Sequence, residues 1–214
     1  MQDQAMTPTT QTGEQTMVST GGLFVNPVGI AIADNGALFI VDDFGRQVVG
    51  VDPVTGQQTL ISFSGHFLNP FGIAIDAQGD LIISDVIADS VIRVDSTTGV
   101  QTVASSDGDF IDPFGIAIGP NGDLVIADAN ASGGSGAVIV VDPQTGMQSI
   151  LSSGGSFFNP VGVAVDSNGD IFIGDANGSK VIRVDATGLQ LGSLLDFTLY
   201  SRRFPQSLTC KIKQ

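Results

Sequence analysis

The apolar residues of this chain come in short runs, and each run ends at a cluster of Gly, Asp, Asn, Pro or Ser. One stretch shows the pattern clearly: GIAID at 72–76, DLIISD at 80–85, VIRVD at 91–95 and VQTVA at 100–104. Short apolar runs bounded by turn residues are typical of β-strands, and the intervals suit an up-and-down meander. The pattern therefore predicts an all-β chain built from four-stranded antiparallel units.

The unit occurs four times. The phrase GLFVNPVGIAI at 22–32 returns with small changes at 65–75, 108–118 and 155–165. The repeats start near Asn26, Asn69, Asp112 and Asn159, at intervals of 43, 43 and 47 residues. This period is typical of a β-propeller, in which four-stranded blades surround an axis. The predicted strands are apolar on both faces, as expected when each sheet packs between two neighbours.

One phenylalanine precedes the first strand of every unit, at positions 24, 67, 110 and 157. The four rings could form an aromatic platform for a ligand. We favour a structural interpretation, because a residue type repeated at one position of every unit usually fills the same gap between adjacent blades. In that case truncation of such a ring is expected to cost about 3–5 kcal/mol.

The two ends of the chain differ from the repeats. Residues 12–19 match residues 55–62, so the chain opens on the last strand of an earlier unit. Either strand 13–19 completes the fourth unit and closes a four-bladed ring, or the chain is a partial propeller with two open edges. We assign residues 13–197 to the blades and residues 1–12 to a disordered segment. Residues 198–214 are a basic tail unrelated to the repeats, which we attribute to truncation or a frame shift.

Charge narrows the choice of partners. The net charge is −14, and a surface this acidic repels phosphate backbones, so no nucleic acid is expected as a partner. No run approaches the roughly 18 apolar residues of a membrane span. Cys210 is the only cysteine, which excludes an internal disulfide framework. Richness in Ser, Thr, Gly and Asp with little Lys favours an extracytoplasmic location in a larger bacterial protein.

The repeat consensus, NPxGIAI followed by an Asp-closed second strand and VIRVD, resembles the NHL repeat over residues 26–185. Pro27, Gly29, Asp42 and Asp52 carry the pattern in the first unit. The resemblance implies a ring of six blades, which favours the partial propeller. It also implies a platform that binds protein, glycan or RNA, although related six-bladed propellers include gluconolactonase-like hydrolases, streptogramin lyases and an amidating lyase.

Oxygen-bearing side chains collect on one predicted face, where the loop entering each first strand meets the loop between the second and third strands. The residues of this rim are Asn26, Asp42, Asp43, Asn69, Asp85, Asp89, Asp112, Asp128, Asn130, Asn159, Asp175 and Asn177. Calcium takes six to eight such oxygens, so the second-strand residues Asp42, Asp85, Asp128 and Asp175 are candidate calcium ligands. No segment has the spacing of a dedicated calcium loop. We favour the alternative in which each Asp accepts hydrogen bonds from its own tight corner.

Enzymatic chemistry finds little support in this chain. His66 is the only histidine and stands where the other units have Leu23, Asp109 and Ser156, which indicates a variable loop residue. One imidazole cannot build a multi-histidine zinc site. The resemblance implies a glutamate metal ligand for a gluconolactonase-like enzyme, yet Glu14, the only glutamate, lies outside the repeats. We assign no catalytic or cofactor-binding residue.

A second local difference is the insertion at 129–136, AlaAsnAlaSerGlyGlySerGly, which gives the third unit its greater length. We expect a flexible, tolerated loop that could contact a partner. Taken together, these features predict a non-catalytic binding or interaction module for a protein or carbohydrate partner. The alternative is a fragment of a propeller enzyme, a hydrolase or lyase, whose catalytic residues lie outside this chain.

Overall fold

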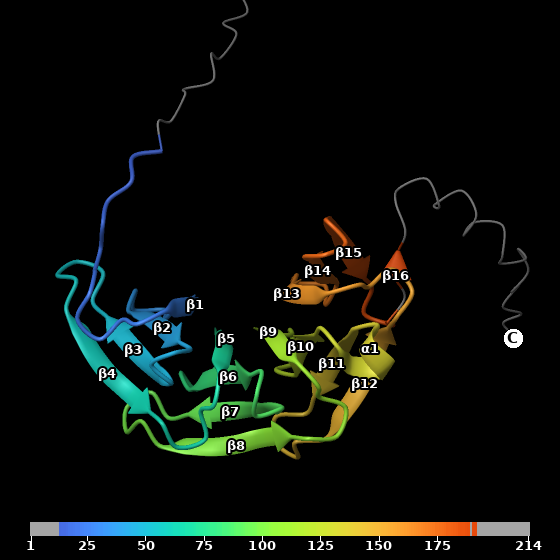
Figure 1. The fold of residues 1–214 in the computed structure, drawn as a ribbon, viewed down its shortest axis with the longest axis horizontal. Helices are drawn as coiled ribbons and strands as arrows, with labels where there is room; N and C mark the ends of the chain where they lie inside the picture. Colours follow the sequence, from blue (N-terminus) through green and yellow to red (C-terminus); the bar gives the residue numbers. More distant parts are fainter. Residues whose placement is uncertain (1–12, 189, 192–214) are drawn as a thin grey trace, which may run out of the picture.

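The computed structural model describes residues 13–188 and 190–191, which form four antiparallel sheets of four consecutive strands each (Figure 1). Blade 1 holds β1 (Pro27–Ile32), β2 (Leu38–Asp42), β3 (Gln47–Val51) and β4 (Gln58–Phe63). Blade 2 holds β5 (Pro70–Ile75), β6 (Leu81–Asp85), β7 (Ser90–Val94) and β8 (Gln101–Ser106). Blade 3 holds β9 (Pro113–Ile118), β10 (Leu124–Asp128), β11 (Ala137–Val141) and β12 (Gln148–Ser153). Blade 4 holds β13 (Pro160–Val165), β14 (Ile171–Asp175), β15 (Lys180–Val184) and β16 (Gln190–Leu191).

The blades stand side by side around an arc whose innermost strands are β1, β5, β9 and β13 (Figure 1). Neighbouring inner strands approach so closely that a Cβ atom on Gly115 would lie 2.6 Å from the carbonyl oxygen of Val161. Phe71 and Phe114, one residue after each inner-strand proline, meet edge to face with ring centroids 5.0 Å apart. A glycine is therefore required at this position, where the inner strands converge on the axis.

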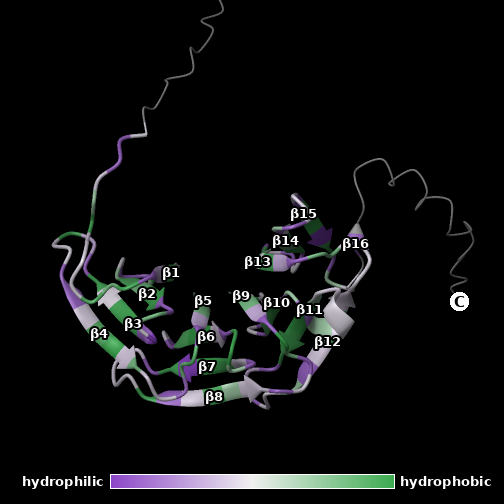
Figure 2. Cartoon of the chain, in the orientation of Figure 1, coloured by the Kyte–Doolittle hydropathy of each residue, from purple (hydrophilic) through white to green (hydrophobic). Residues whose placement is uncertain are grey.

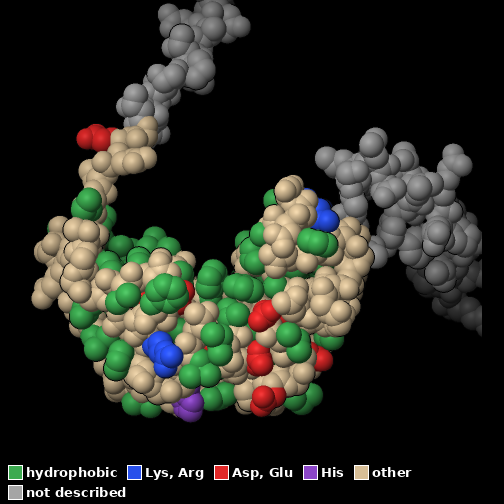
Figure 3. All heavy atoms as spheres, viewed as in Figure 1, with side chains coloured by type: hydrophobic (Ala, Val, Ile, Leu, Met, Phe, Trp, Pro, Cys, Tyr) green, Lys and Arg blue, Asp and Glu red, His purple; other side chains and the backbone are tan. Residues whose placement is uncertain are grey.

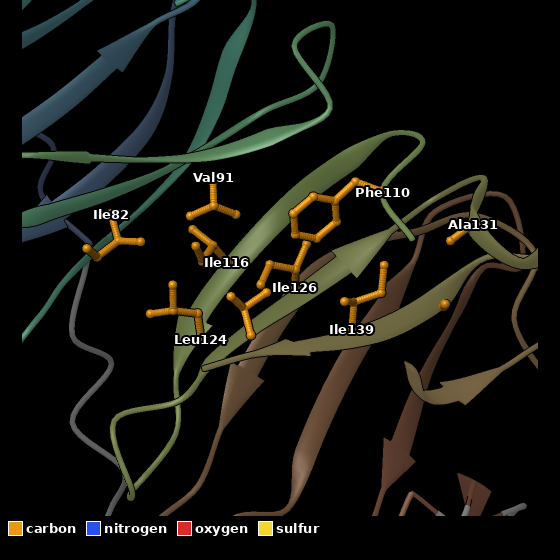
Figure 4. Packing of buried hydrophobic residues seen from close by; sticks show 10 residues of the cluster. Ile82, Val91, Phe110, Ile116, Leu124, Ile126, Ala131 and Ile139 are labelled. Carbon is orange, nitrogen blue, oxygen red and sulfur yellow. The ribbon is translucent and has the colours of Figure 1, made fainter. Parts of the chain in front are cut away.

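The core lies between the blades. The middle strands are the most hydrophobic, whereas outer strands such as β8 are mostly polar or neutral (Figure 2). In the gap between blades 2 and 3, Ile82 and Val91 pack against Ile116 and Leu124, with the ring of Phe110 in the same cluster (Figure 4). Burial of apolar area of this kind is the main stabilising contribution to the fold.

The repeated phenylalanines fill these gaps. Phe67 packs between blades 1 and 2, Phe110 between blades 2 and 3, and Phe157 between blades 3 and 4, and all three are buried. Phe24, which precedes blade 1, is only half-buried and packs against that blade alone. The structural interpretation of the rings is confirmed for the three that have a blade on each side.

The outer strands β4, β8 and β12 follow one another head to tail around the rim (Figure 1). At the first two junctions a serine near the end of one outer strand bonds to the turn before the next outer strand: Ser62 Oγ donates to the carbonyl of Gly99, and Ser105 Oγ donates to the carbonyl of Gly146, both at 2.8 Å. Gln101, the first residue of β8, donates to Ser62 Oγ at 2.9 Å and accepts the backbone N–H of His66 at 2.6 Å. These bonds hold each blade to the blade before it.

The start of the described chain occupies the same kind of junction. Ser19 Oγ donates to the carbonyl of Gly56 at 2.8 Å, and Gln58 donates to Ser19 Oγ at 3.0 Å. Residues 18–19 therefore lie where the outer strand of a preceding blade would end, as the sequence match predicts. They lie on blade 1 and not on blade 4, whose fourth strand is β16.

The four-bladed ring is therefore wrong. Blades 1 and 4 stand at opposite ends of an open arc, and the fold is a partial propeller (Figure 1). The physical reason is that Ser19 bonds to Gly56 of blade 1, so this segment does not supply the fourth strand of blade 4, which is β16. The predicted segments 1–12 and 198–214 lie outside the described residues.

We expected the insertion at 129–136 to be a flexible loop. The first half of this insertion is instead anchored to blade 3. It contains a single helical turn, α1 (Ala131–Gly134), in which Ser132 has a positive φ. Ala129 and Ala131 are buried, and Ala131 belongs to the cluster between blades 2 and 3. The two alanines anchor the loop because their small methyl groups fit beneath it. No helix within the described ranges is long and apolar enough to cross a membrane.

Candidate functional site

One aspartate at the end of each second strand holds two loops together on one face of the arc, which we call the loop face. In blade 2, the carboxylate of Asp85 accepts the backbone N–H groups of Leu68 at 2.7 Å and Asn69 at 2.9 Å, in the loop that enters β5. It also accepts the N–H of Ala88 at 3.0 Å, in the loop between β6 and β7. The equivalent residues Asp42, Asp128 and Asp175 make the same kinds of contact.

These four carboxylates are buried, and both of their oxygens accept backbone donors. The amide N–H groups occupy positions around these oxygens that a cation would need. Each of the four lies in a different blade, and within residues 13–188 and 190–191 no group of three or more His, Cys, Asp or Glu could hold a metal ion. The contacts support the structural role; calcium stays a prediction, which isothermal titration tests.

Two further rim pairs fix the inner edge of the loop face. Asn26 Nδ2 donates to Asp43 Oδ1 at 2.9 Å in blade 1, and Asn130 Nδ2 donates to the carboxylate of Asp112 in blade 3. Each pair joins the loop entering a first strand to the loop after the second strand. The rim oxygens of these blades therefore hold the loops in place through hydrogen bonds.

Negative charge concentrates between blades 2 and 3. Burial raises the pKa of Asp89, and the neighbouring carboxylates of Asp112, Asp128, Asp107 and Asp85 raise this pKa further. Figure 3 shows acidic side chains gathered over these two blades. The neighbouring carboxylates create a negative potential at the surface. This potential attracts the cationic groups of a binding partner.

Exposed apolar side chains lie among these polar groups. Their members in the loops that enter the first strands are Val25, Leu68, Ile111 and Phe158, which are 44% to 66% exposed. Phe44 and Ile87, in the loops after the second strands of blades 1 and 2, are 73% and 65% exposed. We call these six residues the apolar crescent.

The four crescent residues in the loops that enter the first strands each donate their backbone N–H to the buried aspartate of the same blade. Leu68, for example, donates to Asp85. The loop that carries the side chain is therefore held in place while the side chain points to solvent. Sequence reasoning missed this set. The available signal was that the residue before each repeated Asn or Asp of the phrase is apolar in all four units.

The residues considered for catalysis remain apart from this set. His66 is exposed, and its backbone N–H is bound to Gln101. Glu14 is exposed in the segment before blade 1. Neither lies within a group of His, Cys, Asp and Glu side chains in the described part of the chain.

No protein-family model matches the chain, and no curated protein matches it at a significant level. Solved structures do match. Virginiamycin B lyase from Staphylococcus aureus aligns with a TM-score of 0.66 and 18% identity, covering 82% of this chain and 57% of the lyase chain. A chain of the nidogen/laminin complex aligns with a TM-score of 0.68 and 19% identity, covering 77% of this chain and 63% of that chain.

A putative gluconolactonase aligns with a TM-score of 0.60 and 19% identity, covering 77% of this chain and 62% of that chain. The chain thus spans 57% to 63% of the length of these three structures. Two of the three are named as enzymes and one as part of a protein complex. At this level of identity the likeness shows the fold: the chain is a β-propeller arc of four blades, in keeping with the resemblance to NHL-type repeats.

Proposed function

We propose that the arc is a non-catalytic binding module that takes a protein partner on the loop face. The observation that carries the proposal is the apolar crescent, because the same loop position bears an exposed apolar side chain in every blade. Structural need does not explain the repetition. The repeated phenylalanines Phe67, Phe110 and Phe157 are buried between blades, whereas Leu68, Ile111 and Phe158, one residue later, remain exposed.

Exposed apolar side chains gathered on one face mark interaction sites more often than scattered ones do. Here the anchoring by Asp42, Asp85, Asp128 and Asp175 fixes the loops in advance, so little conformational entropy is lost when a partner binds. Loops held by a rigid scaffold are also where propellers and other repeat folds carry binding residues. The loop face therefore has the properties of a preformed binding surface.

The chemistry of the face indicates the kind of partner. Apolar side chains bury against apolar side chains, and the acidic cluster around Asp89 attracts Lys and Arg. A protein segment that carries both apolar and basic residues meets both demands. A carbohydrate partner is the alternative, and it would stack on the exposed rings of Phe44 and Phe158.

The test is a selection from phage-displayed random peptides, with a glycan array in parallel, using the whole chain as bait. We expect enriched peptides that combine Lys or Arg with apolar residues. Their binding should be lost in a chain carrying Ile87→Asp and Phe158→Asp. The matched control carries Val54→Asp and Val100→Asp, two exposed apolar residues in turns between third and fourth strands, and it should bind normally.

Thermal unfolding monitored by circular dichroism establishes that both double variants are folded. Enrichment on the glycan array alone would replace the protein partner by a carbohydrate. No enrichment on either, or binding that survives the substitutions in the apolar crescent, would contradict the proposal.

A further inference from the structure

Among the described residues, no blade covers the outward faces of blade 1 and blade 4 at the two ends of the arc. In blades 2 and 3, the faces that point to the following blade are closed: Ile82 and Val91 of blade 2 are 0% exposed against blade 3. The strand registers place Phe172 and Val181 at the same positions in blade 4, and these are 38% and 75% exposed. Blade 4 therefore presents, unburied, a surface that the other blades bury.

The opposite end presents the matching half of the same contact. Ile73 of β5 and Ile116 of β9 pack toward the preceding blade and are 9% and 8% exposed. Their equivalent in β1 is Ile30, which is 62% exposed. Phe24 is likewise half-buried where its counterparts Phe67 and Phe110 are buried.

The backbone edges at the two ends are complementary as well. In blade 1 the third strand pairs along its length with the fourth, from Gln47 opposite Phe63 to Val51 opposite Gln58. In blade 4, among the described residues, β15 pairs with β16 only at Arg183 and Val184. No described residue therefore pairs with Lys180, Val181 and Ile182 on this side of β15, and such an edge favours strand addition.

Residues 17–20 are the corresponding half-strand. They match residues 60–63 of β4 in sequence order, and Ser19 makes the junction contact with Gly56 that Ser62 makes with Gly99. No sheet in the described part of the chain includes them. Within residues 13–188 and 190–191, one end of the arc shows only the first half of an outer strand, and the other end carries an outer half-strand that joins no sheet.

We propose that the arc binds a second copy of itself head to tail, with blade 4 of one copy packed on blade 1 of the next. Residues 17–20 of the second copy complete the edge of β15, with Met17 opposite Ile182 and Ser19 opposite Val181. The contact reproduces the three blade junctions already present within one chain. It joins two different surfaces, so copies add one after another and form a ring where the rotation between copies closes.

Two copies joined at both ends contain eight blades, which lies within the range of four to eight found in propellers. This interface involves the blade ends, whereas the proposed partner binds the loop face. Failure of one proposal therefore leaves the other standing.

Substitutions at each end test the proposal by light scattering after size-exclusion chromatography. We expect a species of at least twice the 22.0 kDa of one chain. Val181→Asp on blade 4 and Ile30→Asp on blade 1 should each give only the 22.0 kDa species, because every junction then contains one substituted face. Met147→Asp, at a residue of the central blade 3 that is 71% exposed, should leave the larger species intact.

The decisive experiment mixes the Val181→Asp chain with the Ile30→Asp chain. A head-to-tail contact predicts that the mixture forms a dimer, since blade 4 of the Ile30→Asp chain and blade 1 of the Val181→Asp chain are both unaltered. A chain with Ser19→Cys, Val181→Cys and Cys210→Ser should also form disulfide-linked copies. A chain with Ser19→Cys, Met147→Cys and Cys210→Ser, whose second cysteine lies in the central blade 3, should not. A wild-type chain that stays at 22.0 kDa at all concentrations, or a mixture that does not associate, would overturn the proposal.

Discussion

Leu68 donates its backbone N–H to the buried carboxylate of Asp85 at 2.7 Å, while its own side chain points into solvent. In this pair one residue has a structural role and the other belongs to the proposed binding surface. The aspartate fixes the loop, and the fixed loop displays an apolar side chain. The same relationship holds in the other three blades, through Val25, Ile111 and Phe158.

Replacement of Asp85 by Ala should unfold blade 2 more easily, because three backbone N–H groups lose their acceptor in a buried corner. An unsatisfied buried donor costs about 1–3 kcal/mol, so we expect a loss of about 3 kcal/mol or more in the free energy of unfolding. Urea denaturation measures it. Asp85→Asn, which keeps one acceptor oxygen, should lose less, and an Asp85→Ala variant as stable as the wild type would mean that the contacts contribute little.

Phe110→Ala should destabilise the fold by about 3–5 kcal/mol, because the ring is buried between blades 2 and 3. The matched control is Phe158→Ala, where the exposed ring should contribute less than about 0.5 kcal/mol. Thermal melts of the two variants separate the roles of the two phenylalanines. Equal melting temperatures would contradict the assignment of Phe110 to the core.

Asp89→Asn should stabilise the protein at neutral pH. The pKa of Asp89 is raised by burial and by neighbouring carboxylates, so ionisation costs more in the folded state than in the unfolded state. Stability then falls as the pH rises through the folded-state pKa above the ordinary value of 3.8. Removing one of these like charges is expected to contribute about 0.2–1 kcal/mol.

The difference between Asp89→Asn and wild type should shrink as the pH is lowered through the raised pKa, and it should level off below the ordinary value of 3.8, where Asp89 is protonated in both the folded and the unfolded state. Urea denaturation over a pH series measures this difference. A constant difference across the series would show that the charge of Asp89 is not its cause.

The pKa of Asp142 is shifted in the opposite direction to that of Asp89. The backbone N–H groups of Gln144 and Thr145 lower its pKa from the ordinary value of 3.8. A depressed folded-state pKa contributes stability above the unfolded-state value, and this contribution is lost as the pH falls through the folded-state pKa. Asp142→Asn should therefore be less stable than wild type at about pH 6 and should approach wild type near about pH 2. A difference that grows in acid would reverse the assigned sign.

Much of the fold follows from residue patterns that have one physical solution. Apolar runs on both faces, turn residues at fixed offsets and buried phenylalanines such as Phe67 all specify packed blades, and the structure has them. The number of blades in the ring did not follow. Residues 12–19 have the pattern of an outer strand in either arrangement, and only the contact between Ser19 and Gly56 shows which blade they adjoin.

The candidate site was predicted in part. The structural role preferred for the second-strand aspartates agrees with the backbone contacts of Asp42 and Asp85. The apolar crescent was missed because repetition alone does not distinguish Phe157, which is buried, from Phe158, which is exposed. Adjacent residues of one loop point in opposite directions, and only the three-dimensional course of the loop decides which of them meets solvent.

The most direct measurement for the loop face is methyl NMR of the whole chain, labelled at Ile, Leu and Val, during titration with peptides recovered from the selection. The account predicts that the methyl signals of Val25, Leu68, Ile87 and Ile111 shift in a saturable manner. Signals of Val54 and Val100, equally exposed but away from the loop face, should stay in place. Shifts confined to Val54, Val100 or Val181, with the apolar crescent unchanged, would contradict the loop face as the binding surface.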